Sequence, residues 1–338
     1  MASLLIALGF LPVLVLLAGL QAMDSFKLVP LRLVTRSGLL GCLAAALAFV
    51  VNLACLRVAG FSPELVTGVT GPLVEEAVKA IPVILLVACF RVGFMVDAGI
   101  HGFAIGTGFA IAENAYYAAH LTGVAPWLWA IRGLGTAVMH GCSTAILAVL
   151  SKQIADKRNS RGPAVFLPGF SLAVALHVAF NRLAPGSALA ALAPLLVSPF
   201  ALLLVFELSE RATRDWLGRG FDHDVEILEL LSSGELTRSS TGRYLESLRS
   251  RFPGAVVADM LCMLQIHLEL ALRAKGMVMA RQLGIALPPD RDVEDRFREL
   301  RYLERAIGRT GLLAVTPLLR TTSRDLWHLY LLSQKPRP

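Results

Sequence analysis

Six side chains that can take part in acid–base or metal chemistry interrupt long apolar stretches of this chain. They are Glu75, Glu76, Glu113, His140, His177 and Asn181. Carboxylates and imidazoles carry protons to and from a reacting group, and both are ligands for metal ions such as zinc. Because ionisable groups are costly at membrane depth, they indicate a functional site there, which could serve transport, ion binding or intramembrane catalysis.

The spacing of these residues places them on shared helix faces. Lys79 follows Glu75 by four positions and Glu76 by three, so it can neutralise one carboxylate and leave the other free. Two further pairs are four positions apart: Phe109 with Glu113, and His177 with Asn181. The pattern predicts that several helices turn polar faces toward one cavity.

The composition is that of an integral membrane protein. Hydrophobic residues make up 55% of the 338, charged residues only 17%, and the mean hydropathy is +0.63. Soluble proteins average about 25% charged residues. We attribute the net charge of +7 to loops at the lipid surface and to an arginine-rich tail, and we expect no nucleic-acid partner.

Seven apolar segments are long enough to cross a bilayer, which takes about 20 residues. They cover residues 3–20, 38–59, 66–90, 98–119, 128–150, 164–183 and 187–207. Basic residues concentrate in alternate loops, such as 21–37 and 151–163, which predicts an outside N-terminus and a cytoplasmic C-terminus. The predicted fold is an all-α, polytopic transmembrane bundle of about seven spans, in a membrane that we expect to be the bacterial plasma membrane.

The charged residues divide the chain into two predicted domains. Residues 1–209 hold only 12 of the 32 lysines and arginines and 8 of the 25 acidic residues. We predict a transmembrane domain over 1–209 and a cytoplasmic helical domain over 210–338. Residues 256–279 are apolar, but charged residues interrupt them, so we predict a packed amphipathic helix there. No candidate catalytic residue lies after 209, so we expect this region to regulate or to dock a cytoplasmic regulator.

The predicted topology also sets the depth of the polar residues. At a rise of about 1.5 Å per residue, the carboxylates and histidines lie roughly 9 to 18 Å from the outer ends of their spans. Four predicted helices therefore present polar groups within one layer. A common depth favours one shared site over scattered structural hydrogen bonds.

Several motifs of the chain resemble those of the PrsW family. Residues 75–79 read EEAVK, an EExxK motif, and residues 108–117 read GFAIAENAYY, which resembles the family's FxxxE motif. His140-Gly141 and residues 177–181, HVAFN, are similar to its later histidine-bearing helices. The wider superfamily of CAAX prenyl endopeptidases and bacteriocin-processing proteins often has His where Glu113 stands, and it places Arg one residue after the position of Lys79.

The resemblance implies an intramembrane endopeptidase that cleaves a membrane-anchored, anti-sigma-factor-like protein within the lipid bilayer. Glu75 is then the leading base that activates water, with Glu76 as its partner. His177 and Asn181 form the expected oxyanion pair, Glu113 and His140 orient water or the leaving group, and Lys79 and Phe109 support the site. The layer in the outer half of the membrane predicts cleavage near the extracytoplasmic boundary.

In the mechanism above, a glutamate activates water without a metal ion, and we prefer it from the sequence. A metal-dependent mechanism stays open beside it. Glu113, His140 and His177, with Glu75 or Glu76, would supply the ligands of a catalytic zinc ion. The chain has no HExxH motif, so these ligands would come from separate helices.

Two further classes of function use the same residues differently. A proton- or cation-coupled transporter could bind its ion at the buried carboxylates, although no pair of broken helices in matching halves indicates one. A non-catalytic scaffold would tolerate loss of the carboxylates.

Overall fold

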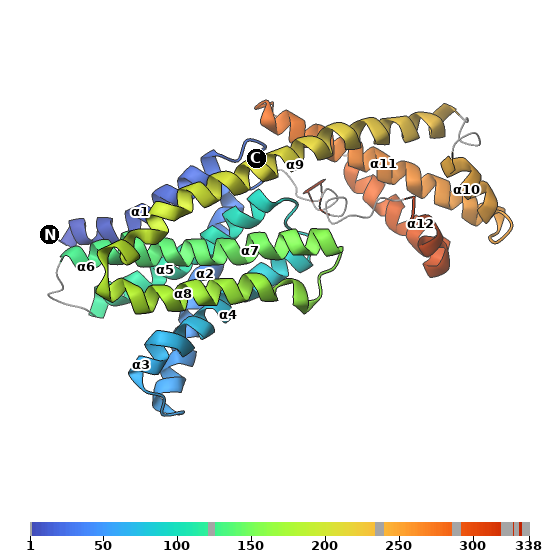
Figure 1. Ribbon diagram of the computed structural model, residues 1–338. Coiled ribbons are helices and arrows are strands. Elements are labelled where there is room, and N and C mark those ends of the chain that lie inside the picture. Colours follow the sequence, from blue (N-terminus) through green and yellow to red (C-terminus); the bar gives the residue numbers. More distant parts are fainter. Residues whose placement is uncertain are drawn as a thin grey trace. The chain divides into compact units, whose positions relative to one another are not determined.

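The computed structural model describes residues 2–120, 126–233, 240–285 and 292–318, together with positions 327, 331 and 332 near the C-terminus. The described residues contain helices and connecting turns but no strand, as predicted for an all-α protein (Figure 1). The chain divides into two compact units, Met1–Glu210 and Arg211–Pro338.

The first unit is built from long helices joined by short turns. Its elements are α1 (Ala2–Ala22), α2 (Leu31–Arg57), α3 (Pro63–Leu65), η1 (Val66–Thr70), α4 (Gly71–Ala88), α5 (Met95–His120), α6 (Pro126–Ala130), η2 (Ile131–Ala137), α7 (Val138–Arg158), η3 (Pro163–Val165), α8 (Leu167–Leu183), η4 (Ala184–Gly186) and the first half of α9 (Ala188–Ser233). A helix therefore covers each of the seven predicted segments.

Four helices are long and apolar enough to cross a membrane, judged by length and composition over the described residues. They are Leu31–Arg57, Met95–His120, Leu128–Arg158 and Gly254–Gln282. The first three fall on predicted spans. The helix that contains Glu75, Glu76 and Lys79 is not among them. The number of seven spans and the cytoplasmic C-terminus stay predictions.

The second unit has its own apolar core. It holds the end of α9, α10 (Ser240–Leu248), α11 (Gly254–Gln282) and α12 (Asp292–Val315). Although α11 is one of the four helices apolar enough to span, its residues Met260, Met263, Leu264 and Leu270 are buried in this core. The apolar side chains of α11 are thus used for packing within the unit.

Helix α5 is the central helix of the first unit. Every residue from Val96 to Ala110 is buried, because α2 packs against one side of the helix and α7 against another. In Figure 1, α5, α7 and α8 run side by side, and contacts between α7 and both neighbours agree. A helix buried all round explains why α5 shows no amphipathic pattern.

Glycines allow α5 to approach both neighbours at backbone distance. A Cβ atom on Gly108 would lie 1.9 Å from the carbonyl oxygen of Gly38 in α2, and one on Gly106 would lie 2.1 Å from that of His140 in α7. Small residues at such positions are typical of close helix packing in membranes. Gly106 thereby sets the distance of the His140 backbone from α5.

Gly106→Ala should therefore push α7 away from α5 at His140. We expect it to destabilise the fold by about 1–3 kcal/mol, the usual cost of overpacking, despite the better helix propensity of alanine. Gly99→Ala in the same helix is the matched control, because its Cβ would meet only Val149 Cγ2 at 3.5 Å. Thermal unfolding in detergent measures both variants, and equal melting temperatures would contradict this packing argument.

Two π-helical segments lead into the helices that carry the polar residues. The segment η1 directly precedes α4 with its two glutamates, and η2 directly precedes α7 with His140. A π-helical turn holds more residues than an α-helical turn, so it changes the direction of the side chains around it, and such turns are frequent at functional sites.

Candidate functional site

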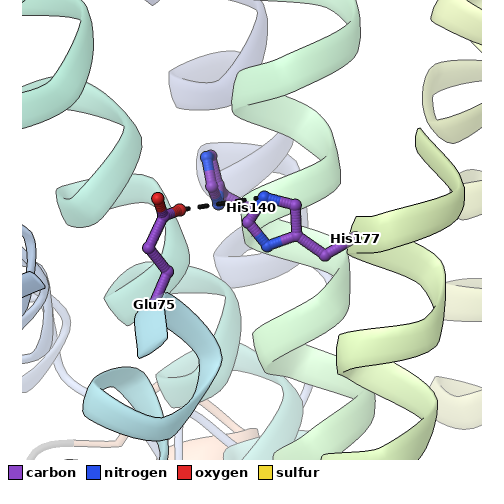
Figure 2. A group of neighbouring side chains, drawn as sticks. All are labelled: Glu75, His140 and His177. Atoms are coloured by element: carbon purple, nitrogen blue, oxygen red, sulfur yellow. Dashed lines mark ion pairs between the residues drawn. The ribbon is translucent and has the colours of Figure 1, made fainter. Parts of the chain in front are cut away.

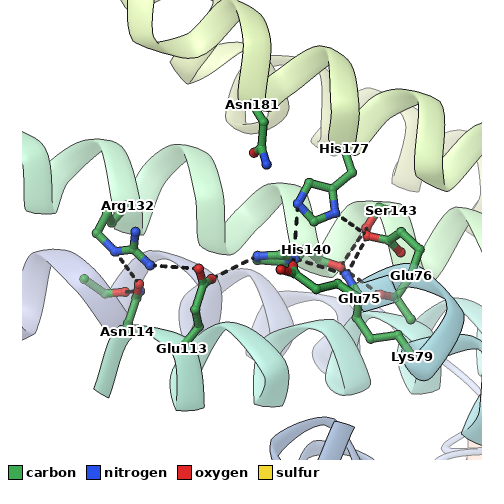
Figure 3. Close-up of polar contacts among 12 residues, drawn as sticks. Glu75, Glu76, Lys79, Glu113, Asn114, Arg132, His140, Ser143, His177 and Asn181 are labelled. Atoms are coloured by element: carbon green, nitrogen blue, oxygen red, sulfur yellow. Dashed lines mark hydrogen bonds and ion pairs between the residues drawn. The ribbon is translucent and has the colours of Figure 1, made fainter. Parts of the chain in front are cut away.

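Five of the six predicted site residues come together in the structure. Glu75 and Glu76 come from α4, Glu113 from α5, His140 from α7 and His177 from α8 (Figure 3). Side chains from four helices thus meet in one place, as the common depth in the sequence predicted.

Glu76 is the most enclosed member of the cluster. Its side chain is fully buried, and Oε1 accepts hydrogen bonds from Lys79 Nζ at 2.6 Å, His177 Nδ1 at 2.8 Å and Ser143 Oγ at 3.2 Å. Its Oε2 has no hydrogen-bond partner among the described residues. Three donors on one buried oxygen fix this carboxylate, so Glu76 joins α4, α7 and α8.

The bond to Glu76 also orients His177. Because a carboxylate only accepts, Nδ1 of His177 is the nitrogen that donates to Glu76. The Nε2 of His177 lies 3.7 Å from Glu75 Oε2, and the Glu75 side chain is 19% exposed. Of the two adjacent glutamates, Glu75 is therefore the one with access from outside the cluster.

Lys79 lies fully buried between two members of the cluster. Its Nζ contacts Glu76 Oε1 and lies 3.1 Å from His140 Nδ1, and it sits 4.8 Å from the centre of the Phe109 ring. The Phe109 ring packs 5.0 Å from the His140 ring. Lys79 thus neutralises Glu76, and Glu75 is the carboxylate of the pair that Lys79 does not contact.

Glu113 has partners on both carboxylate oxygens. Oε2 lies 3.1 Å from His140 Nε2, and Oε1 forms an ion pair with Arg132 Nη2 at 3.3 Å. Its side chain is 25% exposed. Sequence reasoning missed Arg132, although a basic residue inside the predicted fifth span was a signal that could have identified it.

Glu75, His140 and His177 are grouped as a metal site would require. One ligand atom of each lies within 4.8 Å of those of the other two (Figure 2). One carboxylate and two imidazoles are a donor set of catalytic zinc, and a carboxylate behind a ligating histidine, as Glu76 stands behind His177, is a usual companion. Both ring nitrogens of His140 already have partners, so ligation through either would replace one contact.

This group differs from the metal set that led the sequence analysis. Glu75, considered there as an additional ligand, stands in the group, and Glu113 does not. The reason is that Glu113 contacts His140 from α5, whereas Glu75 contacts His177 from α4. Both contacts depend on how the helices pack against one another, and the spacing of residues within one helix does not predict that packing.

Asn181 makes a different contact from the one predicted. Its Nδ2 donates to the carbonyl oxygen of Thr67 in η1 at 3.0 Å, and no dashed line joins it to the other residues drawn in Figure 3. Its role in an oxyanion pair stays a prediction. Asn52 was missed: its Nδ2 lies 3.4 Å from Glu75 Oε1. A polar residue in the second predicted span was the available signal.

Comparison with known proteins gives one match. No curated protein and no solved structure matches this chain. The model of the PrsW family, described as intramembrane metalloproteases, matches residues 29–206, which is more than half of the chain and includes every residue of the cluster. The resemblance seen in the motifs is confirmed, and the chain belongs to the PrsW family of intramembrane metalloproteases.

Proposed function

We propose that this protein hydrolyses a peptide bond of a membrane-anchored substrate at the cluster around Glu75, Glu113, His140 and His177. The observation that carries the proposal is the difference in burial among the three carboxylates. Glu76 is buried and fixed by three donors, whereas Glu75 and Glu113 are partly exposed beside the histidines. A partly open pair of carboxylates with two imidazoles can supply the base and the acid that peptide hydrolysis by water requires.

Glu75, His140 and His177 are the residues that would hold the metal ion that the family description names. When bound, a zinc ion there would polarise the scissile carbonyl and make a water molecule more acidic. The metal-free mechanism that we preferred from the sequence is therefore replaced in this proposal by a metal-dependent one.

Buried residues next to the three proposed metal ligands orient these ligands. Glu76 keeps the proton of His177 on Nδ1, so that Nε2 faces Glu75. Lys79 balances the charge of Glu76, and its contact with His140 Nδ1 is the one that the metal ion would replace, so that His140 Nε2 keeps its contact with Glu113. Such outer partners hold reacting groups in one geometry before the substrate arrives.

Glu113 is the carboxylate left to move the proton. With Glu75 assigned as a ligand, Glu113 takes the base role that the sequence analysis gave first to Glu75. Its Oε2 would accept a proton from water and return it to the leaving amine, and His140 and Arg132 would hold the carboxylate in place meanwhile.

The transporter considered from the sequence is not supported, because the matching family consists of proteases. The protease assignment implies a membrane protein as substrate and the bilayer as surroundings. We propose further, from the resemblance, that the substrate is anti-sigma-factor-like, and from the predicted topology that its cleaved bond lies near the extracytoplasmic boundary of the membrane.

Cleavage by the purified full-length protein in lipid vesicles tests this proposal. We expect at least one member of a panel of single-span membrane polypeptides to be cut in the outer half of its span. The reason is the predicted depth of the polar layer, roughly 9 to 18 Å from the outer ends of the spans. Mass spectrometry of the products locates the cut, and new termini on the cytoplasmic side would contradict the proposed topology.

For the unit Arg211–Pro338 we propose a cytoplasmic regulatory or docking role. No residue of the cluster lies in it, and it packs around a core of its own. If deletion of α10 to α12 left a folded protein unable to cut the same polypeptide, the unit would instead be needed to complete the site.

A further inference from the structure

We propose that Arg132 is a positioning residue for catalysis, which holds Glu113 in the geometry needed for proton transfer. The inference rests on the proposed function and extends it to a residue outside the motifs. Arg132 would touch neither substrate nor metal ion and would act through the carboxylate of Glu113.

The contacts of Arg132 fix its guanidinium from three directions. Nε donates to Asn114 Oδ1 at 2.9 Å, Nη2 pairs with Glu113 Oε1 at 3.3 Å, and the guanidinium carbon lies 3.9 Å from the centre of the Tyr117 ring. The side chain is 15% exposed. A planar guanidinium held by an amide, a carboxylate and an aromatic face has one preferred orientation.

Asn114 connects this arrangement to the first helix. Its Nδ2 donates to the carbonyl oxygen of Gly9 in α1 at 2.8 Å, while its Oδ1 accepts from Arg132, so the side chain is used at both ends. Asn114 is 1% exposed, and exchange of its amide atoms would lose both bonds. The position of Arg132 is thus tied to backbone of α1.

The π-helical segment η2 explains how Arg132 reaches this position. A Cβ atom on the next residue, Gly133, would lie 1.7 Å from the carbonyl oxygen of Leu8, so η2 contacts α1 at backbone distance. The same segment carries Arg132 toward α5, where Glu113, Asn114 and Tyr117 lie along little more than one helical turn. The packing of η2 against α1 and the direction of Arg132 are thus coupled.

The effect on Glu113 follows from its two contacts. His140 contacts Oε2, and Arg132 attracts Oε1 through an ion pair in which its Nη2 makes no hydrogen bond to any described residue, so each carboxylate oxygen has one partner. Without Arg132 the side chain of Glu113 would keep only the His140 contact and could rotate about its last torsion, which is broad for glutamate. The oxygen facing His140 would then be misplaced for part of the time, and small misplacements of reacting groups lower turnover strongly.

Replacement of Arg132 in the full-length protein tests this role. We expect Arg132→Gln to lower kcat on a cleavable single-span polypeptide by about 10- to 100-fold, the usual effect of losing an outer partner, with KM within about 3-fold of wild type. Arg132→Lys should recover part of the loss, because the ammonium restores the charge beside Glu113. Bound zinc per chain should stay at the wild-type value in both variants.

Arg161→Gln is the matched control. Arg161 also lies over an aromatic ring, that of Phe90 at 3.2 Å, but it follows the C-terminal end of α7, whereas His140 lies in the first turn of that helix. We expect it to keep the wild-type kcat, whatever it does to the melting temperature.

Three outcomes would overturn the inference. The first is a wild-type kcat for Arg132→Gln. The second is a loss that Arg132→Lys does not relieve at all while the protein remains folded. The third is a fall in kcat that is accompanied by loss of zinc, which would show a structural role instead. If the wild-type protein itself cuts no polypeptide of the panel, the proposed function fails, and that result is distinct from all three.

Discussion

His177→Ala should leave the purified protein without bound zinc and lower cleavage by at least about 100-fold. His177 is 2% exposed, is oriented by Glu76 through Nδ1 and presents Nε2 to the group of Glu75 and His140. Loss of one of three protein ligands removes most of the affinity for the ion. The same variant also leaves the buried carboxylate of Glu76 without one of its three donors.

Metal content per chain and cleavage rate are the two measurements for this variant. Asn181→Ala is the control for metal content, because Asn181 lies one turn further along α8 and donates to Thr67 instead. It should keep its zinc. Full zinc occupancy in a folded His177→Ala protein would remove His177 from the ligand set.

Glu113→Gln should have an effect of similar size on turnover but none on the metal. The amide has the same shape and can still accept from His140, yet it cannot take a proton from water. General-base residues typically contribute about 10²–10⁴-fold to rate, so we expect a loss in that range. Because Glu113 is not one of the three grouped ligands, zinc per chain should equal that of the wild type.

Glu64→Gln serves as the control for this charge change. Glu64 is an exposed carboxylate in the first turn of α3, away from the cluster. Its variant should cleave at the wild-type rate. If Glu113→Gln cleaved as fast as Glu64→Gln, the proton would have to be moved by another group, with Glu75 the next choice.

The sequence was sufficient to predict the helices and most of the cluster, because charge at membrane depth is rare. Glu75, Glu76, Glu113 and His140 each stood out as a polar residue in an apolar segment, and all of them meet in the structure. The same reasoning could not decide between Glu75 and Glu76. Adjacent residues on a helix point about 100° apart, and only the packing of α4 against α7 and α8 shows that Glu76 is the buried one.

Contacts that depend on irregular helices could not be predicted from helical spacing. Arg132 faces Glu113 from a π-helical segment, and Asn181 donates to a carbonyl in another. Helical spacing assumes a regular turn of about 3.6 residues, so it assigns wrong directions to side chains around such segments. The apolar helix α11 shows a related limit, since composition alone does not separate a packed core helix from a membrane span.

The most direct test of the account is cleavage of a single-span polypeptide by the purified full-length protein before and after removal of zinc by a chelator. We predict cleavage by the zinc-loaded protein, loss of cleavage on chelation and recovery when zinc is restored, with no recovery in His177→Ala. Undiminished cleavage by protein shown to contain no metal would contradict the metal-dependent site, and would return the role of the base to Glu75 in the metal-free mechanism.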